Sequence, residues 1–359
     1  MFSDKHYVPA IKWRQGEYGA LEELRAHHKV DITPLVDVPP IPWDFAEERP
    51  TKTIDTHVAR MPDQMVKAWG KERPIFVDIG LVDPGARLAT GQHPLDGLFM
   101  ALATAGVQAV PVTATDRDDN YQRAVAAIVA RDGRGLCVRA VADDFDSTAS
   151  LGILTDLIDA FGISRGDIDL IIDMGAIAPG QSGLMARVVS TALALIGGAA
   201  EFRTLTVLSG AFPTDLAAVP QGVSLIPRAD WIMWLTLRSQ PLDRQPSFGD
   251  YTAAHPEPKE IDPRLMQASA SIRYATDTEW VIARGRSVNS PKFGGYAQFN
   301  RLSAALMAHP AFTGASFSWS SDYITACASG GQTGNLTTWR KVATNRHMSR
   351  TAHQIANLP

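Results

Sequence analysis

The chain has 359 residues, of which 45% are hydrophobic and 20% are charged, and its formal net charge is -4. This balance is typical of a soluble globular protein and argues against a broad nucleic-acid-binding surface. No apolar run approaches the ~20 residues that span a bilayer, and no apolar segment of signal-peptide length follows Met1, so we expect a cytoplasmic protein without membrane association. The sequence gives no indication of the oligomeric state.

Short apolar runs alternate with amphipathic segments along most of the chain. The clearest run is Asp169–Ile177, which is too short for a helix and is followed by Pro179 and Gly180. Such runs are typical of strands that are buried on both faces, because alternation disappears when neither face meets water. We expect eight strands of this kind, near residues 8–12, 33–37, 75–79, 109–113, 136–140, 169–173, 203–208 and 247–252.

An amphipathic segment follows nearly every strand. We expect helices near residues 16–27, 56–69, 94–105, 120–131, 150–161, 182–200, 228–238 and 296–308. Alternation of strands and helices predicts a parallel sheet that is covered by helices. Eight units, and the absence of a G-x-G-x-x-G turn after the first strand, favour a (β/α)8 TIM-like barrel over a doubly wound open sheet.

Two segments lie outside this repeating pattern. Residues 268–274 and 280–286 flank Thr276-Asp277-Thr278, which is the pattern of a β-hairpin. We expect a barrel over residues 1–310, with the hairpin inserted at about 268–287 between strand eight and its helix. Residues 311–359 are expected to form a C-terminal helical extension packed on the barrel.

Polar residues stand at the ends of the expected strands. In a TIM barrel the carboxyl ends of the strands meet at one face, the mouth, where known active sites of this fold lie. The strand ends place eight candidates there: Lys12, Asp37, Asp78, Thr113, Arg139, Asp173, Ser209 and Asp250. Four carboxylates, two cations and two hydroxyl groups suit a polar or anionic ligand, or a cation such as Mg²⁺ or Mn²⁺.

The acids are the first candidates for catalysis. Asp78 and Asp173 directly follow apolar runs, and Asp37 and Lys12 come next. The alternative is that these acids pair with nearby cations and form polar layers of the barrel core. In the first case Arg139 would bind a ligand, and in the second it would pair with the acids.

The Phe248–Tyr251 segment also has two readings. Gly249 allows close approach of the backbone to a ligand, with Asp250 and Tyr251 contributing to the site, or it marks a kink in the closing strand.

Three arginines lie on the expected hairpin. Arg273, Arg284 and Arg286 could hold a phosphate or a stacked base. The alternative is a set of surface arginines that pair with Asp277 and Glu279.

Several common catalytic patterns are missing from the sequence. The nine histidines show no His-x-His or H-E-x-x-H spacing, and Cys137 and Cys327 have no metal-type spacing. Ser209-Gly210 lacks the G-x-S-x-G elbow of serine hydrolases, and no P-loop follows Gly330-Gly331. A zinc enzyme, a serine hydrolase and a P-loop nucleotide-binding protein are therefore disfavoured.

Short motifs along nearly the whole chain resemble the beta protein family. They are Tyr7–Lys12 with Gly16-Glu17, Ile32–Asp37, Asp230-Trp231 with Trp234, Phe248–Tyr251, Ser271–Tyr274, Arg284–Arg286, Ser321–Ile324, Trp339-Arg340 and His347. Asn345-Arg346-His347 departs from the family pattern, which has paired histidines there. The resemblance implies a setting in phages or in bacterial gene clusters suspected of antiphage defence, and it implies no settled activity.

Two hypotheses follow for the function. The first is a hydrolase or lyase, such as a metal-assisted phosphoester hydrolase, acting at the mouth on a phosphorylated or nucleotide-like ligand. The second is a non-catalytic component of a defence module that binds a small anionic ligand or a phage or defence protein. A catalytic metal site requires mouth acids with an open coordination position, whereas a binding protein would have a mouth filled by salt bridges and a large apolar patch elsewhere. A glycosidase with two mouth carboxylates ranks lower, because no aromatic platform is evident at the strand ends.

Overall fold

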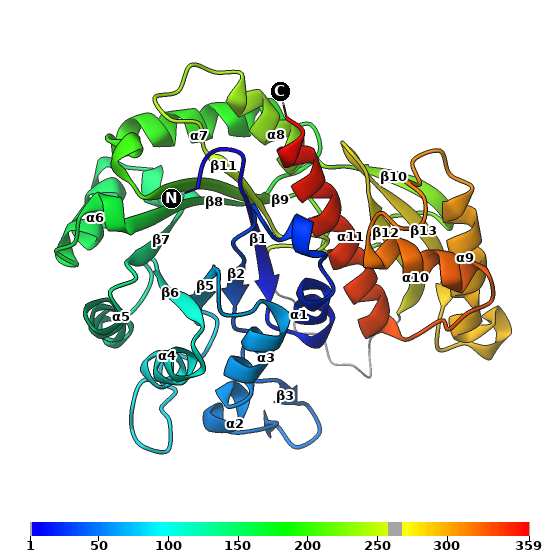
Figure 1. The fold of residues 1–359 in the computed structure, drawn as a ribbon, viewed down its shortest axis with the longest axis horizontal. Coiled ribbons are helices and arrows are strands. Elements are labelled where there is room, and N and C mark those ends of the chain that lie inside the picture. Colours follow the sequence, from blue (N-terminus) through cyan, green and yellow to red (C-terminus); the bar gives the residue numbers. More distant parts are fainter. Residues whose placement is uncertain (1, 258–267, 359) are drawn as a thin grey trace.

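The protein forms a closed eight-stranded parallel barrel in a computed structural model that describes residues 2–257 and 268–358 (Figure 1). The ring order is β1-β11-β9-β8-β7-β6-β5-β2, and every pairing around it is parallel. Its strands are β1 (Tyr7–Lys12), β2 (Leu35–Asp37), β5 (Pro74–Asp78), β6 (Gln108–Thr113), β7 (Leu136–Val141), β8 (Ile168–Ala176), β9 (Thr204–Gly210) and β11 (Ser247–Asp250). Each overlaps a strand expected from the sequence, so the prediction of a TIM-like barrel is confirmed.

Helices surround the barrel, and β3 (Trp43–Asp44) and β4 (Arg49–Pro50) form a short hairpin after β2. The helices are α1 (Gln15–Glu22), α2 (Ile54–Val58), α3 (Met61–Ala68), α4 (Pro94–Ala105), α5 (Asp119–Asp132), α6 (Thr148–Ala160), α7 (Ser182–Ile196) and α8 (Ala229–Arg238). The single helix expected at 56–69 is divided into α2 and α3, and Pro62 stands in the first turn of α3, where its missing N–H is tolerated. No helix among the described residues is long and apolar enough to cross a membrane.

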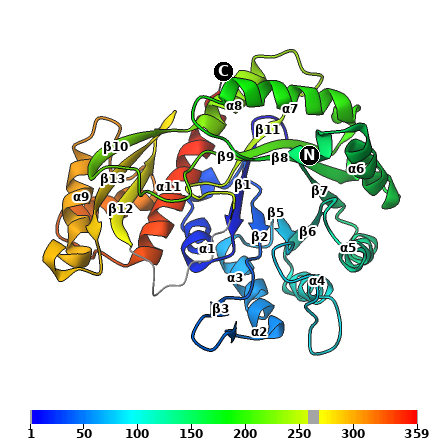
Figure 2. The same cartoon turned by 180° about the vertical axis from the view of Figure 1, so that it is seen from behind.

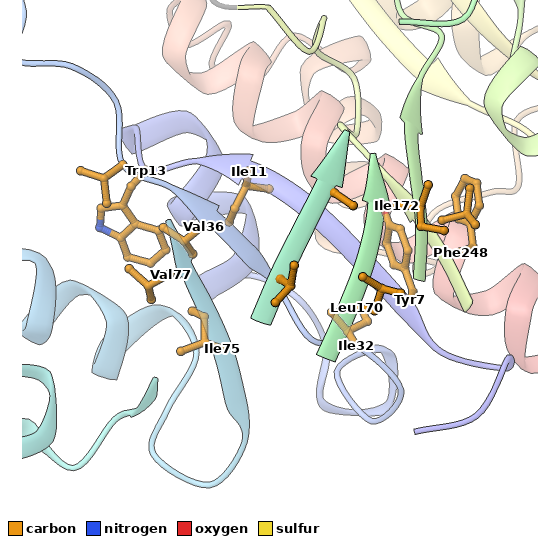
Figure 3. Close-up of a cluster of buried hydrophobic side chains, with 14 of the residues drawn as sticks. Tyr7, Ile11, Trp13, Ile32, Val36, Ile75, Val77, Leu170, Ile172 and Phe248 are labelled. Carbon is orange, nitrogen blue, oxygen red and sulfur yellow. The ribbon is translucent and has the colours of Figure 1, made fainter. Parts of the chain in front are cut away.

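The barrel strands are buried on both faces. Alternate residues such as Val8, Phe76 and Ile171 form a cluster inside the barrel. The residues between them, such as Ile11 and Phe248, pack outward beneath the helices (Figure 3). Successive side chains of a strand point to opposite faces, so a shift of one residue decides whether a polar group reaches the mouth or the helix layer.

A second, smaller layer stands beside the barrel. The expected hairpin forms from β12 (Ser269–Ala275) and β13 (Glu279–Ser287), which pair antiparallel as predicted. A third strand, β10 (Gly222–Pro227), joins β13; it lies between the strand expected at 203–208 and the helix expected at 228–238, where no strand was expected. We call β10, β13 and β12 the side sheet; residues of α9 (Gln298–Met307) and α10 (Trp319–Ala328) share a hydrophobic cluster with it.

The last helix, α11 (Leu336–Ala356), lies between the barrel and the side sheet (Figures 1 and 2). It packs on α1, β1 and β12, and Asn345 Nδ2 donates to the carbonyl oxygen of Ala20 at 3.1 Å. The helix expected to follow strand eight in the barrel forms as α9, but it covers the side sheet. The helix that covers the barrel in its place is α11.

Candidate functional site

Arg139, on β7, is the centre of the barrel mouth. Its Nη1 donates to Asp37 Oδ1 at 2.8 Å and to Asp78 Oδ2 at 3.1 Å, and its Nε donates to Asp173 Oδ2 at 2.9 Å. Its Nη2 donates to Tyr251 Oη at 2.7 Å, and the Tyr251 hydroxyl donates in turn to Asp173. We call these five residues the Arg139 web. The structure thus brings together six of the predicted site residues, since Lys12 lies on β1 next to Asp37.

The web is held together by a balance of charge and burial. Burial disfavours the Arg139 guanidinium, but its carboxylate neighbours raise its pKa well above the usual value. Burial also raises the pKa of Asp37, against the effect of Arg139. At Asp78 the burial effect is outweighed by Arg117 and Arg139, and the pKa is lowered. Each acid of the Arg139 web forms an ion pair with Arg139.

Further contacts, from side chains and backbone N–H groups around the web, fix its acids in place. Arg117 Nη2 lies 3.1 Å from Asp78 Oδ2, and Tyr121 Oη donates to Asp78 Oδ1 at 3.2 Å. The backbone N–H groups of Gly80 and Gly175 donate to Asp78 and Asp173 at 2.7 and 2.9 Å. Arg117 and Tyr121 were not predicted from the sequence, although the charged run Asp116-Arg117-Asp118 directly after β6 was a signal.

Cations also hold the loop after β11 at the edge of the mouth. Lys12 Nζ donates to the carbonyl oxygens of His255 and Pro256, both at 3.2 Å, and burial lowers its pKa. Arg273 Nη1 donates to the Ala253 carbonyl at 2.7 Å, and Arg340 Nη1 donates to the same oxygen at 3.2 Å. Arg273 therefore lies by the mouth, apart from the other two hairpin arginines.

The placement of Asp250 at the mouth was wrong. Its Oδ1 accepts from Tyr7 Oη at 2.6 Å and its Oδ2 from His347 Nε2 at 2.6 Å, on the outer side of the barrel wall. Trp280 Nε1 donates to His347 Nδ1 at 3.1 Å, so the histidine proton sits on Nε2. The physical reason is strand alternation: Tyr251 points inward to the Arg139 web, and its neighbour Asp250 must point outward.

Two further strand-end residues also leave the mouth. Thr113 Oγ1 donates to Gln122 Oε1, on helix α5, at 2.7 Å. Ser209 is fully buried, and its hydroxyl has no hydrogen-bond partner among the described residues. It alternates with Leu208, whose side chain lies in the interior cluster, so it faces the helix layer.

A pocket of about 260 Å³ lies at the carboxyl ends of β1 and β2; we call it the β1–β2 pocket. Trp13 and Tyr18 form its aromatic wall, with ring centroids 5.3 Å apart. Lys52 and Arg60 also line it, and neither makes an ion pair within the described part of the chain. No Asp or Glu lines this pocket.

The same pocket contains an unsatisfied acceptor. His57 Nε2 donates to the Pro39 carbonyl at 2.8 Å, which leaves Nδ1 as the acceptor atom of a neutral ring. Burial lowers the pKa of His57, so the ring stays neutral at pH 7. Nδ1 is buried and has no hydrogen-bond partner in the described structure. These pocket residues were not predicted, because they come from α1, the β4–α2 loop, α2 and α3.

A pocket of about 250 Å³ lies at the carboxyl ends of β5 and β6, the strands that follow β2 in the ring. Arg117 lines it together with three acids, Asp83, Asp116 and Asp118. The Arg117 guanidinium is already paired with Asp78 and Asp116. The charge around this pocket is therefore negative, and it does not suit an anionic ligand.

The described residues offer no ready site for a divalent cation. No group of three or more His, Cys, Asp or Glu side chains among residues 2–257 and 268–358 is arranged to hold a metal ion. Asp37, Asp78 and Asp173 converge, but on a guanidinium group. The mouth acids, held by Arg139, therefore do not fit the Mg²⁺ or Mn²⁺ ion that the sequence left open.

Arg284 and Arg286 lie far along β13, at a third pocket that the side sheet and α9 form. Their predicted partners are not their partners: Asp277 pairs with Arg350, and Glu279 lies at the other end of the strand. The hairpin arginines therefore do not form one cluster, since Arg273 lies at the mouth.

Comparisons with known proteins were made for the whole chain. The family described as Beta protein matches residues 7–353. No curated protein matches the chain. Among solved structures, triosephosphate isomerase from Bartonella henselae is similar at 12% sequence identity and a TM-score of 0.37, over 69% of this chain and 93% of that chain. A likeness this low carries no argument, and the barrel assignment rests on the strand pairing.

Proposed function

The chain belongs to the Beta protein family, and we propose that it binds a small phosphorylated, nucleotide-like ligand at the β1–β2 pocket without chemically changing it. The observation that carries this proposal is the state of the mouth. Asp37, Asp78 and Asp173 all accept hydrogen bonds from Arg139. A carboxylate held in this way is a poor general base, because proton uptake would break its ion pair. Of the two hypotheses drawn from the sequence, a filled, salt-bridged mouth supports the binding protein.

The β1–β2 pocket supplies the ligand class. Lys52 and Arg60 offer two cations to a phosphate, with no carboxylate in the lining to compete for them. Trp13 and Tyr18 offer an apolar wall to a base. The Arg139 web then fixes the end of β2 beside the pocket, through the bond from Arg139 to Asp37. A role in phages or in antiphage defence stays a prediction.

Calorimetric titration with three probes tests the proposal: inorganic phosphate, ribose 5-phosphate and adenosine 5′-monophosphate. Affinity should rise in that order, because each probe adds groups that the pocket can contact. The Lys52→Gln/Arg60→Gln double variant should bind adenosine 5′-monophosphate at least about tenfold more weakly, equivalent to ~1.4 kcal/mol. Arg187→Gln, which removes an exposed cation on α7, should bind as the wild type does.

Turnover is measured on the same samples by chromatography of the nucleotide and by phosphate release. The proposal expects the nucleotide to be recovered unchanged. Its consumption by wild type but not by Asp173→Asn would support the hydrolase hypothesis instead. Failure of the wild type to bind any of the three probes would remove the ligand assignment.

A further inference from the structure

A third pocket lies on the side sheet, away from the barrel mouth. Its volume is about 580 Å³, and its walls come from the end of β13, the start of β10, residues 292–294 and the first turns of α9. The side sheet is separated from the barrel by α11 in both views (Figures 1 and 2). We call it the side-sheet pocket; none of its residues belongs to the Arg139 web or to the β1–β2 pocket.

The charged side chains that line this pocket are all positive. Arg284, Arg286, Lys292 and Arg301 line it, and no Asp or Glu does. None of these four cations makes an ion pair within the described part of the chain. The chain as a whole has a net charge of -4, so four clustered cations depart from its average. Like charges in a concave site repel each other and concentrate anions there.

The four cations differ in how firmly they are held. Arg284 is fixed by the structure, since its Nη1 donates to the Val219 carbonyl and its Nε lies 3.4 Å from Ser269 Oγ. Arg286 Nε donates to Gln221 Oε1 at 3.0 Å, which positions the group and leaves its two terminal nitrogens without a partner among the described residues.

The remaining two cations have no fixed partner. Lys292 and Arg301 are exposed, and neither makes a side-chain hydrogen bond in the described structure. Arg286 lies 4.7 Å from the Phe293 ring centroid and Lys292 lies 5.8 Å from it, so the ring packs beside two cations. Three cationic heads are therefore available to a ligand.

A buried glutamine builds the floor of the side-sheet pocket. Gln298 Oε1 accepts from the Arg286 backbone N–H at 2.8 Å, and its Nε2 donates to the Gly295 carbonyl at 2.9 Å. A Cβ on Gly285 would lie 2.7 Å from Gln298 Oε1, so a side chain there would displace the Gln298 amide from this arrangement. The floor ties β13 to the start of α9 and sets the spacing of Arg286 and Arg301 before any ligand arrives.

From these observations we infer that the side-sheet pocket binds a ligand with two or more linked phosphate groups. Three available cations exceed what one phosphate needs, and phosphate oxygens match the donors of guanidinium and ammonium groups. The linked phosphates belong either to a small polyphosphate or to the backbone of a single-stranded nucleic acid. This inference does not depend on the ligand proposed for the β1–β2 pocket.

The test is a titration of the full chain with inorganic pyrophosphate and, separately, with a short oligothymidylate. Lys292→Glu/Arg301→Glu should weaken binding of whichever probe the wild type binds by at least about tenfold. These side chains are exposed and unpartnered, so the variant should fold, which circular dichroism checks. Arg187→Glu makes the same kind of charge change on α7 and should bind as the wild type does.

The two probes separate the two sources of phosphate. Tighter binding of pyrophosphate identifies a small polyphosphate ligand, whereas tighter binding of oligothymidylate with a steep salt dependence identifies a nucleic acid backbone. The Lys52→Gln/Arg60→Gln variant should still bind the probe that the wild type binds. Loss of binding at the β1–β2 pocket can therefore be distinguished from loss of binding at the side-sheet pocket. The inference is overturned if the wild type binds neither probe. It is also overturned if the charge-reversed pocket binds as the wild type does, or if Arg187→Glu weakens binding equally.

Discussion

Replacing Arg139 by methionine should destabilise the protein more than any change to its acidic partners. Methionine keeps much of the side-chain length and removes the charge that Asp37, Asp78 and Asp173 share. Each of these carboxylates is at most 6% exposed, and Arg117 can compensate only Asp78. Breaking a buried ion pair by removing one partner typically costs about 3–5 kcal/mol. We expect a loss of this size in the free energy of unfolding at pH 8.

The pH dependence gives a second readout of Arg139→Met. Without the guanidinium, burial raises the folded-state pKa of the carboxyl groups above the unfolded value. An acid with a raised folded pKa binds more protons in the folded state, so stability falls as pH rises through this range. The difference from wild type should therefore be larger at pH 8 than at pH 5.

Urea unfolding at both pH values measures the effect of Arg139→Met, and the slopes must agree between variants. The control is Arg25→Met, which removes a largely exposed pair with Asp322 and should cost about 0–1 kcal/mol. A cost for Arg139→Met below about 1 kcal/mol at pH 8, or a larger cost at pH 5, would refute the reasoning. The Arg139 web would then contribute little to the fold.

Two other substitutions test the buried acids. Asp173→Asn leaves Arg139 paired with Asp37 and Asp78, so it should cost only about 1–3 kcal/mol in the same urea experiment; a cost above that of Arg139→Met would contradict the description of the web. Asp230 has a pKa raised from 3.8 to about 7 by burial and by the charge of Asp250, and its Oδ2 has no partner among the described residues. The folded state therefore holds a proton on Asp230 that the unfolded state releases above about pH 4. The free energy of unfolding of wild type should fall relative to that of Asp230→Asn as pH rises from about 4 to 7, and the difference should stay constant above pH 7. Parallel pH profiles of the two proteins would contradict this.

The sequence was sufficient to locate the barrel strands but not to orient their side chains. Strands buried on both faces read as apolar runs, and this signal located all eight. The same burial removes the alternation that would show which face a residue occupies. Asp173 and Asp250 both stand near strand ends, yet one meets Arg139 inside the barrel and the other meets His347 outside it.

Contacts between distant segments could not be predicted from local patterns. β10 is an exposed strand that exists because β13 lies beside it, about 60 residues later in the chain. The β1–β2 pocket depends on how α1 packs near α3, which no spacing in the sequence records. Arg139 was identified as a candidate from its strand, whereas its three simultaneous carboxylate partners come from strands that only the closed ring brings together.

The position of α11 sets an order of events during synthesis of the chain. All eight barrel strands have left the ribosome once residue 250 has emerged, but the helix that packs against β1 is made only with residues 336–356. Until then, Asp250 has no His347 to hold it, and the outer side of β1 lacks its cover. Contacts between such distant segments form slowly, and uncovered apolar surface promotes aggregation in the meantime. We therefore expect the native barrel to be completed only after residues 336–356 have emerged, as a late step of folding.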